Sequence, residues 1–155
     1  MQAESHVILN DEQQGAVRAI LEARSPFFFL TGSAGTGKST VILELKKRFA
    51  AMKKNYLVVA PTAIAAINVE GKTIHSQFAI SSRGLAHFNK KTYTDNNELR
   101  ELIHTLDYLI IDEISMVRAD LMDTILQILK LYGSCPFESN GGVKIVFVGD
   151  LLQLP

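Results

Sequence analysis

The sequence has few of the features that mark secreted or membrane proteins. Its 155 residues include one cysteine, Cys135, which cannot form an internal disulfide and therefore indicates a reducing compartment. Lysine plus arginine number 16, as do aspartate plus glutamate, so net charge gives no support to a nucleic-acid or membrane partner. No run of about 18 apolar residues occurs, and residues 1–10 do not resemble a signal peptide. We expect an intracellular protein with no membrane partner.

Internal repeats and low-complexity tracts are also absent from the sequence. Apolar residues make up 47% and charged residues 21%, a globular balance that argues against disorder. A chain of 155 residues is long enough to bury one sizeable core. We therefore expect a single domain over residues 1–155.

Four continuous apolar segments alternate with segments of helical periodicity. The expected strands are residues 27–31, 56–60, 107–111 and 143–148. The expected helices are residues 10–24, the segment after residue 40, a short helix reaching residue 69, and residues 99–106 and 121–131. Between them, residues 81–97 read as a long polar loop that is either functional or mobile. This order predicts an α/β fold with a mostly parallel sheet that is covered by helices on both faces.

A glycine-rich turn follows the first expected strand. Residues 32–39, GSAGTGKS, fit the phosphate-binding pattern G-x-x-x-x-G-K-[ST] at every fixed position. Glycines let the backbone curl with its N–H groups inward, while Lys38 reaches the β- and γ-phosphates and Ser39 ligates Mg²⁺. The residues expected to hold the nucleotide are Gly32, Ser33, Ala34, Gly35, Thr36, Gly37, Lys38, Ser39 and Thr40.

Two adjacent acids, Asp112 and Glu113, end the third expected strand. Burying acids at a strand end is costly unless a cation or hydrogen bonds offset the cost, and Mg²⁺ beside a triphosphate is such a cation. We assign Asp112 to the magnesium shell and Glu113 to activation of the attacking water as general base. Together with the phosphate loop, the pair predicts hydrolysis of ATP or GTP. Gln153, after the fourth strand, is either a polar loop residue or a sensor of the γ-phosphate, and its spacing leaves both readings open.

Six segments together resemble the motifs of the Pif-one family of superfamily-one DNA helicases. They are residues 9–13, 32–39, 60–63, 71–76, 111–116 and 149–155, and they span nearly the whole chain. The last segment departs slightly, because Leu151 and Leu152 stand where aromatic residues are common. The resemblance implies a RecA-like P-loop NTPase domain that uses ATP and Mg²⁺ to move 5′ to 3′ along single-stranded DNA. It also implies a role in DNA repair, recombination or telomere maintenance.

The resemblance assigns roles to four further residues. It implies that Gln13 contacts adenine, although a glutamine three residues after Asn10 is also typical of a helix cap. It implies that Thr62, Thr73 and His75 line the DNA path, whereas His75 alone would be read as a structural histidine. Hydroxyl and backbone contacts to phosphates need no strong positive charge, which is compatible with the neutral balance of the chain.

The family continues beyond its last motif into a second RecA-like domain that carries arginine fingers, whereas this sequence stops at Pro155. We therefore expect the first motor domain alone, with weak nucleotide binding, little hydrolysis and no unwinding. A GTPase would favour N-K-x-D, and residues 89–92, NKKT, lack the acid. A small-molecule kinase would favour clustered arginines, which the sequence does not show. A nucleotide-gated interaction module remains the alternative from a different class.

Overall fold

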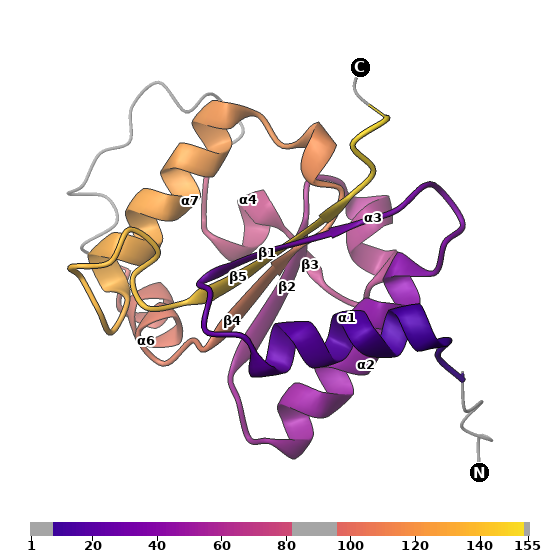
Figure 1. Ribbon diagram of the computed structural model, residues 1–155. Coiled ribbons are helices and arrows are strands. Elements are labelled where there is room, and N and C mark those ends of the chain that lie inside the picture. The colour runs from indigo at the N-terminus through magenta and orange to yellow at the C-terminus, as the bar shows by residue number, and fades with distance from the viewer. Residues whose placement is uncertain (1–7, 82–95, 154–155) are drawn as a thin grey trace, which may run out of the picture.

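One five-stranded sheet organises the computed structural model, which describes residues 8–81 and 96–153 (Figure 1). All strand pairs are parallel, and the strand order is β1-β5-β4-β2-β3. The strands are β1 (Phe27–Thr31), β2 (Tyr56–Ala60), β3 (Lys72–Thr73), β4 (Tyr108–Ile111) and β5 (Lys144–Gly149). The predicted parallel α/β architecture is confirmed.

Helices cover both faces of this sheet. The helices are α1 (Asp11–Glu22), α2 (Lys38–Ala51), α3 (Ala63–Asn68), α4 (Ile74–Gln77), α6 (Asn97–His104) and α7 (Ala119–Tyr132), with a 3₁₀ turn η2 (Ile114–Met116). Helices α1 and α2 pack on one face, and α4, α6 and α7 pack on the other (Figure 1). In the described part of the chain, no helix combines the length and apolar character needed to cross a bilayer.

The central strand β4 shows why the apolar runs are continuous. Leu109 and Ile111 point into the cluster beneath α6 and α7, while Tyr108 and Ile110 point into the cluster beneath α1 and α2. All four side chains are buried, because helices exclude water from both sides of a parallel sheet. The sheet is therefore a rigid base whose carboxyl edge positions the loops that follow each strand.

The region after residue 70 differs from the sequence prediction. Lys72–Thr73 pairs with β2 as a fifth strand, and Ile74–Gln77 forms one turn of helix. Both elements are too short to show a periodicity, which is why the sequence does not predict them. Within the predicted loop 81–97, residues 82–95 lie outside the described residues, and Asn96 caps α6 by accepting a hydrogen bond from the Leu99 N–H at 3.0 Å.

Candidate functional site

The loops after β1, β2, β4 and β5 meet at one edge of the sheet. The pairing register sets Thr31 beside Gly149 and Ile111 beside Phe147, so parallel strands deliver the residues that follow them to the same side. Val59 likewise pairs with Ile111, which brings the Pro61-Thr62 turn to that edge. The predicted convergence of the motifs at one edge is confirmed, at the position where ligands of open α/β sheets bind.

The phosphate loop has the backbone that its glycines predict. Gly35 and Gly37 adopt left-handed conformations with φ of 80° and 83°, which glycine adopts without the strain of a Cβ. A Cβ on Gly32 would lie 2.5 Å from Oγ1 of Thr36, so a larger residue there would displace the Thr36 side chain. The Lys38 ammonium donates hydrogen bonds to the carbonyls of Gly32 at 2.5 Å and Ser33 at 3.0 Å. The loop therefore curls around the cationic head of Lys38.

Asp112 is a buried acid that faces this loop. Its side chain is 7% exposed, and burial raises the pKa of Asp112 above its ordinary value. The hydrogen bond from the Glu113 N–H, 2.9 Å from Oδ1, lowers that pKa, the Glu113 carboxylate raises it, and the Lys38 ammonium lowers it. Lys38 and Asp112 are therefore close enough to interact electrostatically, although they come from different loops.

Glu113 leaves the strand with an unusual backbone. Its φ of 51° and ψ of 46° lie in the left-handed region, where a residue with a Cβ is strained. The conformation turns the chain sharply from β4 into η2 and aligns the Glu113 N–H with the Asp112 carboxylate. Such strain persists only where the surroundings enforce it, and it is common at functional sites.

The oxygen donors at this edge fit a magnesium ion. Asp112 offers a buried carboxylate and Ser39 offers a hydroxyl at the start of α2, and both are the hard ligands that Mg²⁺ prefers. Among the described residues, no group of three or more histidine, cysteine, aspartate or glutamate side chains could cage a metal. Mg²⁺ in nucleotide sites is typically held by one or two protein oxygens together with phosphates, and Asp112 and Ser39 would supply the protein oxygens.

Gln13 both caps α1 and contacts the phosphate loop. Its Oε1 accepts from the Asn10 N–H at 3.0 Å, and its own N–H donates to Oδ1 of Asn10 at 2.8 Å. This reciprocal pair is a capping box, so the structural reading of Gln13 is correct. Its Nε2 also donates to the Thr36 carbonyl at 3.4 Å, and a Cβ on Gly37 would collide with Nε2. The amide therefore rests on the loop that is predicted to hold the nucleotide.

The segment after β5 folds as a tight turn around Asp150. Its Oδ1 accepts from the Leu152 N–H at 2.9 Å, and its carbonyl accepts from the Gln153 N–H at 3.2 Å. Asp150 is only 9% exposed, whereas Gln153 is exposed; residues 154–155 lie outside the described residues. Asp150 is not among the predicted site residues, although, like Asp112, it is an acid that follows an apolar strand.

The predicted DNA-path threonines are helix caps. Oγ1 of Thr62 accepts from the Ala65 N–H at 3.2 Å at the start of α3, and Oγ1 of Thr73 accepts from the Ser76 N–H at 3.2 Å at the start of α4. Thr73 pairs in register with Ala60, so the two caps follow adjacent strand ends. His75 is half-buried in α4. The structure thus brings all three residues to the β2–β3 end of the same edge.

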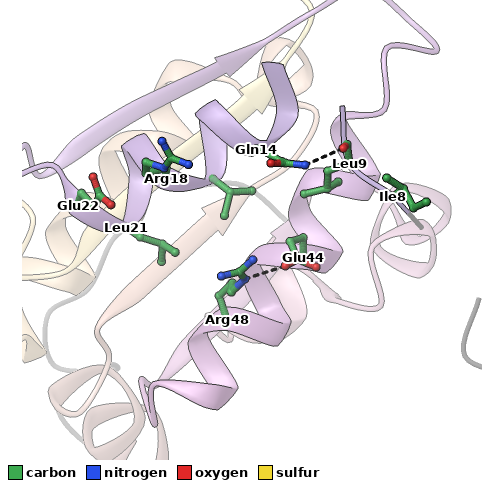
Figure 2. Close-up of a pocket in the computed structure, with 9 residues that line it drawn as sticks. Ile8, Leu9, Gln14, Arg18, Leu21, Glu22, Glu44 and Arg48 are labelled. Atoms are coloured by element: carbon green, nitrogen blue, oxygen red, sulfur yellow. Dashed lines mark hydrogen bonds and ion pairs between the residues drawn. The ribbon is translucent and has the colours of Figure 1, made fainter. Parts of the chain in front are cut away.

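A separate hollow of about 440 Å³ lies between α1 and α2 (Figure 2). The Arg48 guanidinium meets the Glu44 carboxylate at 2.7 Å on one wall, and Nε2 of Gln14 donates to the Leu9 carbonyl at 3.0 Å on the other. The lining residues are Ile8, Leu9, Gln14, Val17, Arg18, Leu21, Glu22, Glu44 and Arg48. None of the predicted site residues lines it, so the hollow is not part of the candidate site.

The fold and the site define a class of protein. A parallel α/β sheet with a phosphate loop after β1 and a buried acid after β4 is the arrangement of P-loop nucleoside triphosphatases. The chain belongs to the PIF1-like helicase family, whose sequence pattern matches residues 8–155. The family and the RecA-like fold that the sequence analysis expects are therefore confirmed.

Individual relatives agree with this assignment. The chain is 35% identical over 159 residues to the ATP-dependent DNA helicase RRM3 of Saccharomyces cerevisiae, covering 99% of this chain and 21% of that protein. It is 35% identical over 150 residues to the human ATP-dependent DNA helicase PIF1, covering 95% and 22%. A crystal structure of a Pif1 helicase from Bacteroides in complex with ADP-AlF3 and single-stranded DNA matches with a TM-score of 0.78 at 37% identity, over 96% of this chain and 33% of that one. The chain thus spans about a fifth of the length of these two curated relatives.

Proposed function

We propose that this chain is the ATP-hydrolysing motor domain of a DNA helicase that moves 5′ to 3′ along single-stranded DNA. The observation that carries the proposal is that the phosphate loop after β1 and the buried Asp112 after β4 lie at the same edge of the sheet. Burying an acid beside a phosphate-binding lysine costs free energy. A metal ion bound next to phosphates would offset that cost, so the two residues together indicate a site for a metal ion and phosphates. The names of the relatives support the choice of ATP and of DNA.

The hydrolytic roles follow from where each group lies. Lys38 would leave the carbonyls of Gly32 and Ser33 and pair with the β- and γ-phosphates, since phosphate oxygens are stronger acceptors for an ammonium group. Ser39 and Asp112 would hold Mg²⁺, which neutralises charge on the phosphates when bound. Glu113, projected by its left-handed backbone, would accept a proton from the attacking water.

Nucleotide recognition is assigned to the loop and its neighbours. The backbone N–H groups of residues 32–40 would surround the phosphates, and Thr40 lies within the first turn of α2. The Gln13 amide would contact adenine, because its Nε2 already lies over the loop at Thr36 and Gly37. Gln153 would sense the γ-phosphate from the turn after β5, as the alternative to a simple loop residue.

DNA contacts are assigned to the caps of the two short helices. The oxygens of Thr62 and Thr73 accept hydrogen bonds from helix N–H groups, so each hydroxyl hydrogen is left to donate to a phosphate oxygen. His75 is the second residue of α4, two positions after the Thr73 cap, and would add a donor near that cap. These contacts are compatible with a chain whose formal net charge is zero.

We further propose that residues 1–155 act as one RecA-like domain and that a second RecA-like domain completes the site. Relatives about five times longer than the matched region support this division. The alternative is a nucleotide-gated interaction module that binds ATP but unwinds nothing.

Labelled ATP and GTP, titrated against the wild-type protein and Lys38→Ala with and without single-stranded DNA, test these proposals. We expect ATP to bind in preference to GTP, and Lys38→Ala to weaken ATP binding at least tenfold, on the order of one lost charge-assisted phosphate contact. A preference for GTP would contradict the helicase assignment. An effect of single-stranded DNA on ATP affinity would favour the motor domain over the interaction module.

A further inference from the structure

Helix α3 presents an apolar face to solvent. Its six residues, AIAAIN, carry no charge, and Ile64 and Ile67 are 76% and 73% exposed. The two side chains are three positions apart and therefore share one face of the helix, while Ala66 on the opposite face is 3% exposed. Single exposed apolar residues are common, but two adjacent isoleucines on an uncharged helix indicate a surface that binds something.

This face begins at the proposed DNA edge. Thr62 caps α3, so Ile64 lies in the first helical turn beside that hydroxyl and Ile67 lies one turn further along. Strands β2 and β3 end together, because Ala60 pairs with Thr73. Figure 1 shows α3 at the carboxyl end of β2. The isoleucines therefore continue the line of groups that are assigned to DNA phosphates.

We propose that Ile64 and Ile67 form a ledge that contacts the bases of single-stranded DNA. The ledge rests on the proposed function: Thr62, Thr73 and His75 hold the phosphates, and the bases of the same strand pack on the isoleucines. Isoleucine is among the side chains that pack against or between bases, and every base offers an apolar face. The contact is independent of sequence, as translocation along DNA requires.

The size of the face favours DNA over a protein partner. A stable protein interface buries about 800 Å² on each partner, and a helix of six residues with two exposed isoleucines offers far less. One or two bases would cover the same two side chains. The ledge also supplies affinity without positive charge, which a chain of zero formal net charge needs.

The test separates base contacts from phosphate contacts. Fluorescence anisotropy is measured with a labelled oligothymidine of about 12 nucleotides and an abasic strand of equal length. We expect the wild-type protein to prefer oligothymidine, and Ile64→Ser with Ile67→Ser to weaken oligothymidine binding roughly tenfold. Binding of the abasic strand should change less than about twofold, and the salt dependence should not change, because phosphate contacts determine it.

Two comparison variants accompany the double serine variant. Phe137→Ser removes an equally exposed apolar side chain, 99% exposed in the loop before β5, and should leave both strands bound as in the wild type. The variant Thr62→Val with Thr73→Val should lower the affinity for both strands by the same factor, because it removes the hydroxyl groups that donate to phosphates. Exposed substitutions change stability little, so melting temperatures should confirm that the serine variants fold.

The outcomes distinguish the ledge from the function on which it rests. A wild-type protein that binds oligothymidine and the abasic strand equally, or a serine variant with full affinity for oligothymidine, overturns the ledge and leaves DNA binding intact. Unchanged DNA affinity with an altered sedimentation coefficient identifies the face as a protein contact. A wild-type protein that binds neither strand overturns both the ledge and the DNA contacts assigned to Thr62, Thr73 and His75.

Discussion

Gly149 at the end of β5 packs directly against Ile114 in the turn that follows Glu113. A Cβ on Gly149 would lie 2.8 Å from Cγ2 of Ile114 and 3.3 Å from its backbone nitrogen. The two residues belong to different motifs, one after β4 and one after β5, and only glycine permits this approach. Ile114 directly follows Glu113, so this contact and the hydrogen bond from the Glu113 N–H to Asp112 both restrain the strained backbone of Glu113.

Gly149→Ala tests this packing. We expect the added methyl group to displace η2 and destabilise the fold by about 1–3 kcal/mol, as overpacking of a filled site does. Melting temperature and ATP turnover should both fall. Adding Ile114→Ala removes the Cγ2 atom that the methyl group meets, so the double variant should regain part of the lost stability. Equal melting temperatures for Gly149→Ala and the wild type would show that the contact is loose.

Asp112→Asn should stabilise the protein at neutral pH in the absence of nucleotide and Mg²⁺. Burial raises the pKa of Asp112, so the folded chain holds its proton to a higher pH than the unfolded chain does. The associated stability is full below the unfolded pKa and is lost as pH rises through the folded pKa. Asparagine keeps the Oδ1 acceptor for the Glu113 N–H and carries no charge, so it avoids that loss.

Thermal melts across pH check this expectation. The melting temperature of Asp112→Asn should exceed that of the wild type by a few degrees at about pH 8, and the gap should close as the pH falls. Asp123→Asn, at an exposed position of α7, is the matched control and should show no such dependence. The same Asp112→Asn variant should lose ATP turnover, because Mg²⁺ needs the carboxylate. A difference in melting temperature that widens as the pH falls would show that the pKa of Asp112 is lowered in the folded protein, not raised.

Gln13 allows its two roles to be separated. Gln13→Glu keeps an oxygen for the Asn10 N–H and places an acid in the first turn of α1, but it removes the Nε2 donor. We expect Gln13→Glu to have the melting temperature of the wild type and to bind ATP more weakly. Gln13→Ala should lose ATP affinity and also about 0.5–1 kcal/mol of stability from the capping box. If Gln13→Glu binds ATP as the wild type does, the glutamine is a cap and nothing more.

The sequence predicts the parts of the site that depend on local chemistry. The apolar runs at residues 56–60 and 107–111 predict strands because both faces of β2 and β4 are covered. Residues 27–31 form a strand as well, but β1 lies at the edge of the sheet and its Phe27 and Phe29 are 39% and 49% exposed, which differs from the buried strand that its apolar run predicts. The phosphate loop is predictable because Gly37, a fixed position of the pattern, has a positive φ, as does the neighbouring Gly35. In the loop the residue type and the backbone conformation agree without contacts from distant parts of the chain.

The features that the sequence does not predict depend on distant contacts. The strand Lys72–Thr73 pairs with β2 over only two positions, where Gly71 packs on the Val58 carbonyl so closely that a Cβ would collide with it. Nothing in a glutamate predicts the left-handed backbone of Glu113, which the surrounding contacts enforce. Whether a helix face stays exposed, as at Ile64, also depends on which elements pack beside it.

Lys46 connects the phosphate-loop helix to the segment that ends α3. Its ammonium group, on a side chain 15% exposed, donates to the carbonyls of Val69 and Glu70, each at 3.2 Å. It also meets the Glu70 carboxylate at 3.2 Å, but that side chain is 74% exposed, so solvent screening leaves the ion pair little stabilising effect. The two backbone carbonyls therefore account for most of the stabilisation by Lys46.

Lys46→Met should destabilise the protein by about 1–2 kcal/mol, because it keeps the aliphatic stem and removes the charged donor from two carbonyls. Since the lost bonds join α2 to the end of α3, we also expect single-stranded DNA to change ATP affinity less in this variant, with ATP affinity in the absence of DNA nearly unchanged. Lys47→Met, at an exposed neighbouring position, is the matched control and should change neither quantity. An equal effect of DNA on ATP affinity in both variants would show that Lys46 stabilises the fold without linking the ATP and DNA sites.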